Sequence, residues 1–223
     1  MESKVIVALD GMTEKEAKDL ASRLAGEVWG FKVNDLLLQS GVRILSELKR
    51  YGKVFADPKL YDIPNTVANA VRAIADAGAD LITLHASGGV EMMSQAVAKA
   101  GDATLLAVTV LTSMDDKAAT TTYRRGAKEA VIDFAKLAHE AGVPGIVCSP
   151  KELEYLTDLP LMKVTPGVRP VWYGKKDDQS RTLSPADAVR SGADLLVIGR
   201  PITGEADPVA AARKIAEELS AAS

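Results

Sequence analysis

Short apolar runs alternate with amphipathic segments from one end of the chain to the other, and this alternation limits the possible folds most. The apolar runs are Lys4–Asp10, Val28–Asn34, Lys53–Lys59, Asp80–Leu84, Ala103–Leu111, Val143–Ser149, Leu161–Thr165 and Leu195–Ile198. They are continuously apolar, which is typical of parallel strands covered on both faces. The segments with helical periodicity are Glu14–Ala25, Asp35–Arg50, Thr66–Ala77, Gly89–Ala100, Lys128–Ala141, Lys151–Leu156, Pro185–Ser191 and Pro208–Leu219. Eight strand–helix units with right-handed crossovers predict an α/β fold, the (β/α)8 or TIM barrel.

An open, doubly wound sheet is the alternative arrangement of the same units. That fold usually carries a GxGxxG turn after its first strand, whereas this chain has Asp10-Gly11-Met12-Thr13 there. The 223 residues suffice for one barrel near the short end of its size range, and no linker or low-complexity stretch divides them. We therefore expect a single barrel domain over residues 1–223.

Charge and cysteine content exclude several classes of protein. The formal net charge is −3 and no basic run is present, which argues against nucleic acid as a partner. Cys148 is the single cysteine, so an internal disulfide is impossible and a reducing compartment is expected. The N-terminal MESKVIVALDG has only a short apolar run, so we expect neither a signal peptide nor a membrane span. These features predict a cytoplasmic protein whose partner is not nucleic acid.

The segment Asp57-Pro58-Lys59-Leu60-Tyr61-Asp62 gives the clearest indication of chemistry. Because side chains alternate along a strand, Asp57 and Lys59 should share one face at the C-terminal end of the third strand, where barrel active sites form. Lys32 interrupts the apolar second strand, and Asp10 ends the first. Clustered charges in a cleft are typical of active sites, so we favour a catalytic array of alternating charges formed by Lys32, Asp57, Lys59 and Asp62.

A structural explanation of these charges remains open. Charged residues inside strands are costly to bury unless they are paired, and an ion-pair network alone would account for them. In that case Asp62 would only cap the helix that begins near Pro64.

The turn after the last strand indicates a phosphate site. Phosphate groups often bind after the seventh and eighth strands of such barrels. Gly199 would let backbone amides approach an anion, and the Arg200 guanidinium would bind its oxygens. About eighteen residues, including Arg169 and Gln179, separate the seventh strand from Ser184, and a loop of this length indicates a lid or binding loop. The alternative is a helix-capping turn with a surface arginine.

Three further residues are more typical of structural roles than of chemistry. His85 ends the fourth strand and resembles a hydrogen-bonded structural histidine more than a pocket residue. His139 falls in a helix and should face solvent, and Cys148 should be a small buried residue. The spacing of histidine and cysteine does not indicate a zinc site, and we expect no bound metal.

At these residues the chain resembles the orotidine 5′-phosphate decarboxylase family, and the resemblance covers nearly its whole length. The matching segments are VIVALD, FKV, DPKLYDIPNT, GADLITLHASGG, VTVLTSMD, TPGVRP, DDQSRTLSPADA and GADLLVIGRPIT. The combination of DPKLYDIPNT with GRPIT is highly specific. The resemblance implies decarboxylation of orotidine 5′-phosphate to UMP in de novo pyrimidine biosynthesis, without a cofactor.

The resemblance also implies roles for individual residues. Lys59 corresponds to the proton donor, within a charged network completed by Lys32, Asp57 and Asp62. The implied substrate contacts are Asp10 with the ribose, Thr112 with the pyrimidine, and Arg169, Gln179, Gly199 and Arg200 with the phosphate. In a homodimer with composite active sites, Asp62 and Thr66 would reach the neighbouring subunit's site.

Two departures and two rival functions accompany the resemblance. Asn34 stands where many bacterial members have glycine, and Pro58 replaces a larger apolar residue.

The first rival function is that of a Mg²⁺-dependent barrel acting on a sugar phosphate. Such relatives carry glutamate where this chain has Lys32, and a cation there would repel Mg²⁺. The second is a non-catalytic nucleotide-binding barrel, which would not require Lys59 between two carboxylates.

Overall fold

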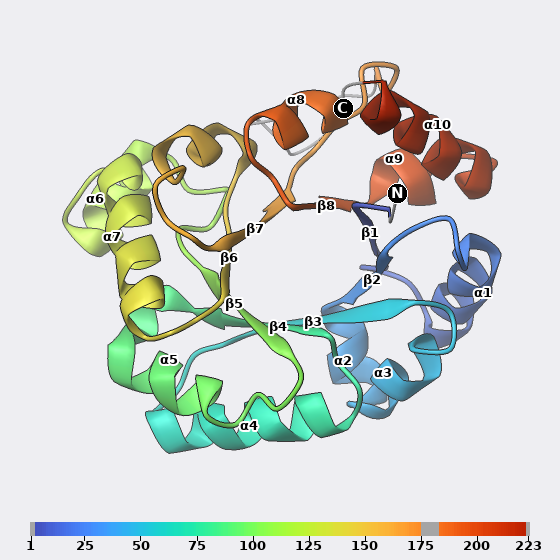
Figure 1. Cartoon of the computed structure of the whole chain (residues 1–223). Helices are drawn as coiled ribbons and strands as arrows, with labels where there is room; N and C mark the ends of the chain where they lie inside the picture. The colour runs from blue at the N-terminus through green and yellow to red at the C-terminus, as the bar shows by residue number, and fades with distance from the viewer. Residues whose placement is uncertain (1–2, 175–182, 222–223) are drawn as a thin grey trace.

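Eight parallel strands close into a barrel in the computed structural model, which describes residues 3–174 and 183–221. The strands follow chain order around the barrel, and β1 pairs with both β2 and β8 (Figure 1). Their bounds are β1 Val5–Ala8, β2 Gly30–Val33, β3 Lys53–Leu60, β4 Leu81–His85, β5 Thr104–Val108, β6 Gly145–Val147, β7 Met162–Pro166 and β8 Leu195–Ile198. Because the sheet closes on itself, the (β/α)8 barrel is confirmed and the open doubly wound sheet is excluded.

Helices form the outer ring around the barrel (Figure 1). The α-helices are α1 Glu14–Leu24, α2 Asp35–Ser40, α3 Arg43–Leu48, α4 Pro64–Asp76, α5 Gly89–Val97, α6 Asp116–Tyr123, α7 Ala127–Glu140, α8 Pro185–Arg190, α9 Arg200–Thr203 and α10 Pro208–Ser220. The described residues also form the 3-10 helices η1 Ala86–Gly88 and η2 Pro150–Tyr155. In the described part of the chain, none of the helices is long and apolar enough to span a membrane.

Four helical segments differ from the sequence-based expectation. The helix predicted over 35–50 is two helices, α2 and α3, because Gly41 takes a left-handed backbone with φ 63° between them. The segment predicted as a helix over 151–156 forms the 3-10 helix η2. Helices α6 and α9 were not expected; α6 begins at an Asp115 cap whose side chain accepts from the Ala118 amide.

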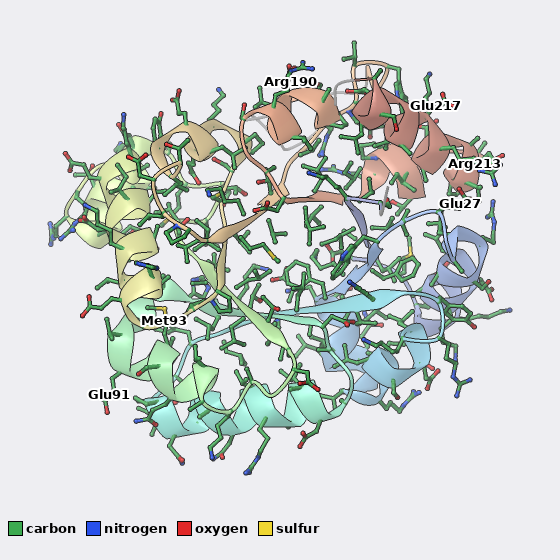
Figure 2. All side chains as sticks on the ribbon, viewed as in Figure 1. Glu27, Glu91, Met93, Arg190, Arg213 and Glu217 are labelled. Carbon is green, nitrogen blue, oxygen red and sulfur yellow. The ribbon has the colours of Figure 1, made fainter. Side chains whose placement is uncertain are left out.

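The apolar core has two parts, one inside the barrel and one between the strands and the helices. The inner cluster consists of Ile6, Phe55, Leu81, Leu106, Val164, Leu195 and Val197. Side chains fill the centre of the barrel, whereas charged groups extend from the helices (Figure 2). The barrel is therefore a solid platform, and a site can form only at its ends.

A surface ion pair connects the first and last parts of the helical ring. Arg213 on α10 pairs with Glu27, which lies between α1 and β2, and so connects the last helix with the first strand–helix unit (Figure 2).

Cys148 is fully buried, as expected, and burial raises the pKa of its thiol to about 12. His139 is exposed on α7, also as expected.

Candidate active site

A pocket of about 620 Å³ opens at the C-terminal ends of the strands. Its floor includes Phe55 and Val197, which belong to the inner core of the barrel. Eight of the residues singled out in the sequence line this pocket: Asp10, Lys32, Asp57, Lys59, Thr112, Arg169, Gly199 and Arg200. The predicted phosphate turn and three members of the predicted charged array, Lys32, Asp57 and Lys59, therefore face one cavity, whereas Asp62 does not line it.

Four charged residues form an alternating chain along one side of the pocket. Lys32 Nζ lies 2.8 Å from Asp10 Oδ1 and 3.2 Å from Asp57 Oδ2. Lys59 Nζ lies 2.7 Å from the same Asp57 oxygen. Lys32 and Asp57 are only 7% and 6% exposed, and neighbours of opposite sign offset the cost of burying each charge.

The register of three adjacent strands brings this chain together. Lys32 on β2 is opposite Ala8 on β1 and Phe55 on β3. Gly30 begins β2, and a Cβ atom there would lie 2.0 Å from the Lys53 carbonyl oxygen, so only glycine permits this close approach of β2 and β3. In this register the Lys32 ammonium lies between the carboxylates of Asp10 and Asp57.

The backbone around Asp57 and Lys59 is irregular. Lys59 adopts a left-handed φ of 50°, which is unfavourable for a residue with a side chain and costs about 1–3 kcal/mol. The Asn34 side-chain amide donates a hydrogen bond to the Asp57 carbonyl oxygen at 2.6 Å. Asn34, one of the two departures noted in the sequence, thus fixes the peptide that joins Asp57 to Pro58.

Thr83 was not singled out in the sequence, yet it forms hydrogen bonds with both Asp57 and Lys59. Its hydroxyl lies 2.8 Å from Asp57 Oδ1 and 3.0 Å from the Lys59 backbone nitrogen. A threonine inside an apolar strand gives no sequence signal of such a role. Only the relative register of β3 and β4 makes it apparent.

Asp62 and Thr66 lie outside the pocket of their own chain. Both residues are exposed, and neither lines the cavity. Asp62 Oδ1 accepts a hydrogen bond from the Ile63 amide at 2.6 Å, and Ile63 is the N-cap position of α4. The Asp62 side chain therefore contacts the turn before the helix without occupying the cap position itself.

The predicted phosphate contacts lie in the segments after β7 and β8. Gly199 follows β8 directly, and Arg200 begins α9. Across the pocket, the Arg169 backbone amide donates to the Leu183 carbonyl, and its guanidinium donates to the Val168 carbonyl at 3.0 Å. The predicted contact Gln179 lies outside the described residues.

His85 lies near the charged chain but does not line the pocket. Its ring meets that of Tyr61 edge to face, with 6.0 Å between the ring centroids. Burial lowers the pKa of His85, and the nearby Lys59 ammonium lowers it further, whereas Asp57 opposes the shift. Within residues 3–174 and 183–221, no group of three or more His, Cys, Asp or Glu side chains is arranged to hold a metal ion.

Fold and site together define a (β/α)8-barrel enzyme with paired lysines and aspartates at the mouth of the barrel. Comparison with known proteins makes the assignment specific. The chain belongs to the Orotidine 5'-phosphate decarboxylase / HUMPS family, whose profile matches residues 3–215. The family resemblance drawn from the sequence segments is thereby confirmed.

Named relatives match over nearly their whole length. The orotidine 5'-phosphate decarboxylase of Alkalilimnicola ehrlichii is 44% identical over 229 residues, which cover 98% of this chain and 97% of that protein. The protein of the same name from Anaeromyxobacter sp. strain K is 46% identical over 224 residues, which cover 97% of this chain and 98% of that protein.

Solved structures agree with the sequence relatives. The crystal structure of orotidine 5'-phosphate decarboxylase from Lactobacillus acidophilus superimposes with a TM-score of 0.84 at 34% identity, covering 98% of this chain and 99% of that one. The crystal structure of orotidine 5'-phosphate decarboxylase from Pyrococcus horikoshii OT3 superimposes with a TM-score of 0.79 at 25% identity. The match covers 97% of this chain and 99% of that one.

Proposed function

We propose that this protein decarboxylates orotidine 5′-phosphate to UMP in de novo pyrimidine biosynthesis, with Lys59 as the proton donor. The observation that carries the proposal is the contact of Lys59 with Asp57 inside the pocket, within the chain Asp10–Lys32–Asp57–Lys59. Membership of the family and the names of the relatives support the substrate. An enzyme of this pathway would work in the cytoplasm, where the free thiol of Cys148 stays reduced.

The chemistry needs a positive charge beside C6 of the pyrimidine ring. When the bond from C6 to the carboxylate breaks, CO2 leaves and the electron pair remains on C6, where the ring delocalises it poorly. The Lys59 ammonium stabilises this developing charge and then transfers a proton to C6, giving UMP and a neutral amine that regains its proton from water. Asp57 lies beside the substrate carboxylate and disfavours the ground state.

The remaining pocket residues hold the rest of the nucleotide. Arg169, Gly199 and Arg200 bind the phosphate, with Gln179 as a further contact. Asp10 binds the ribose and Thr112 the pyrimidine. Binding energy from the phosphate, far from C6, then fixes the geometry at the reacting atom.

The Mg²⁺-dependent sugar-phosphate barrel is the nearest rival. The name of the matched family also covers HUMPS proteins, so family membership alone does not separate the two. The Lys32 ammonium, 2.8 Å from Asp10 and 3.2 Å from Asp57, takes the place of a metal between these carboxylates and favours the decarboxylase.

We also propose a homodimer in which Asp62 and Thr66 complete the partner's site. Asp62 lies between two exposed apolar residues, Tyr61 and Ile63, which are 63% and 68% exposed. Leu38 on α2, in the neighbouring strand–helix unit, is 91% exposed. Large exposed apolar side chains, next to a carboxylate that lies outside the pocket of its own chain, fit an interface that a second copy of the chain covers.

The direct test follows the decrease in orotidylate absorbance with and without EDTA. Full turnover in EDTA is the expected result. Loss of activity in EDTA that Mg²⁺ restores would support the metal-dependent rival. Binding of the nucleotide without any turnover would support the non-catalytic barrel.

A further inference from the structure

The hydroxyl of Thr83 connects the two residues at the centre of the site. Thr83 lies in the middle of β4 and is fully buried. Its Oγ1 atom lies 3.0 Å from the Lys59 backbone nitrogen and 2.8 Å from Asp57 Oδ1. Thr83 itself does not line the pocket, so it acts on the substrate only through these neighbours.

The direction of both hydrogen bonds follows from the chemistry of the groups. A backbone N–H can only donate, so Thr83 Oγ1 accepts from Lys59. The single hydroxyl hydrogen is then directed to Asp57 Oδ1, which as a carboxylate oxygen only accepts. The other oxygen, Asp57 Oδ2, faces the two lysine ammonium groups. Both oxygens of Asp57 are therefore fixed, and the carboxylate cannot rotate without losing a contact.

The register of β3 and β4 explains why a side chain is needed here. Ala56 pairs with Ile82 and Leu60 with Leu84, so three residues of β3, Asp57 to Lys59, lie opposite Thr83 alone. Such a bulge leaves backbone groups without their regular strand partner. The Thr83 hydroxyl binds one of them, the Lys59 amide, in a residue whose φ of 50° is unfavourable.

We infer that Thr83 is a positioning residue that holds Asp57 and Lys59 in their reactive arrangement. The inference rests on the proposed function, in which Lys59 protonates C6. Removing the hydroxyl frees Asp57 Oδ1 and the Lys59 amide together, and the ammonium is no longer fixed relative to the substrate. Small displacements of a catalytic group reduce the rate of the chemical step more than the binding of substrate.

The test compares Thr83→Val, which keeps the shape and removes the hydroxyl, with Thr83→Ser, which keeps the hydroxyl. The matched control is Thr109→Val: Thr109 is 1% exposed and its hydroxyl donates to the Val147 carbonyl at 3.2 Å, away from the pair. The kcat and KM for orotidine 5′-phosphate, the Kd for UMP and the melting temperature are measured for each. If the valine variant does not fold, Thr83→Ala replaces it.

We expect Thr83→Val to lower kcat by roughly 10- to 100-fold, as for loss of a hydrogen bond to a charged group, with KM and the Kd for UMP changed less than about threefold. Thr83→Ser should recover kcat to within about threefold of wild type, and Thr109→Val should leave it unchanged. A kcat for Thr83→Val near that of wild type overturns the inference. So does an equal loss in Thr83→Ser or in Thr109→Val, because the effect would then not depend on this hydroxyl.

Failure of the proposed function gives a different result. In that case the wild-type protein itself does not turn over orotidine 5′-phosphate. A crystal structure of Thr83→Val then decides the role of Thr83: displacement of Lys59 Nζ from Asp57 supports the positioning role, and an unchanged pair overturns it.

Discussion

Lys59 Nζ lies 2.7 Å from Asp57 Oδ2, although the two residues flank Pro58 in an irregular part of β3. Pro58 has no backbone N–H and a restricted φ, so it fits a bulge in which the regular ladder is interrupted. The contact leaves the Lys59 side chain 35% exposed to the pocket, whereas that of Asp57 is 9% exposed. The ammonium is thus both paired and accessible to a substrate.

Replacing Lys59 with alanine should remove nearly all turnover and leave the fold intact. A general acid contributes about 10²–10⁴-fold, and the loss of electrostatic stabilisation at C6 adds to this. The kcat of the purified variant is measured after its circular dichroism is matched to wild type. Lys53→Ala is the control, because Lys53 lies at the other end of the same strand, near the Trp29 ring. Retention of more than about a tenth of wild-type turnover would show that Lys59 is not the proton donor.

Replacing Arg200 with alanine should weaken substrate capture through the phosphate. Loss of a charge-assisted contact costs about 1.5–3 kcal/mol in kcat/KM. Orotidine without the phosphate, assayed at high enzyme concentration, should be almost indifferent to the change. The control is Arg190→Ala, since Arg190 pairs with Asp187 on the surface of α8. An equal penalty on both substrates would place the role of Arg200 elsewhere.

The strands and the place of Lys32, Asp57 and Lys59 at one end of the barrel could be predicted from the sequence because local patterns determine them, whereas Asp62 lies outside the pocket. Continuous apolar runs indicate the strands. Lys32 is the one charged residue in the run of the second strand, and its position in that run is enough to place it in the barrel. The bulge at Asp57–Lys59 and its contact with Thr83 could not be predicted, because they depend on the register between β3 and β4. The break at Gly41 was missed because the apolar periodicity continues across it.

Stability should decrease in mild acid because of His85. Burial holds the pKa of folded His85 below its ordinary value of 6.5, so the unfolded chain binds a proton more readily. The contribution of neutral His85 to stability is therefore complete above about pH 6.5 and is lost as the pH falls from there toward the folded pKa. Melting temperatures of wild type and His85→Gln are compared between about pH 7.5 and 5.5.

The expected result is a shallower pH dependence in His85→Gln than in wild type. The exposed His139 on α7 provides the control, and His139→Gln should keep the wild-type slope. A wild-type slope in His85→Gln as well would show that other groups cause the acid sensitivity.

Mixing two inactive variants should restore activity if Asp62 acts in the partner's site. Lys59→Ala and Asp62→Ala chains are allowed to exchange subunits. In a mixed dimer, the pocket of the Lys59→Ala chain then carries both defects. The other pocket has its own Lys59 and receives an intact Asp62 from the partner. Activity per mixed dimer should approach half of the wild-type value.

The control for this experiment pairs Lys59→Ala with Asp57→Ala. Both of these residues line the pocket of their own chain, so each site of that mixed dimer keeps one defect and no activity should return. Native mass spectrometry measures how much mixed dimer forms in each case. The exposed Tyr61 and Ile63 on either side of Asp62 make contact with a second chain favourable, because covering them removes apolar surface from water. If mixed dimers form and the Lys59→Ala and Asp62→Ala pair stays inactive, Asp62 serves its own chain or no site at all.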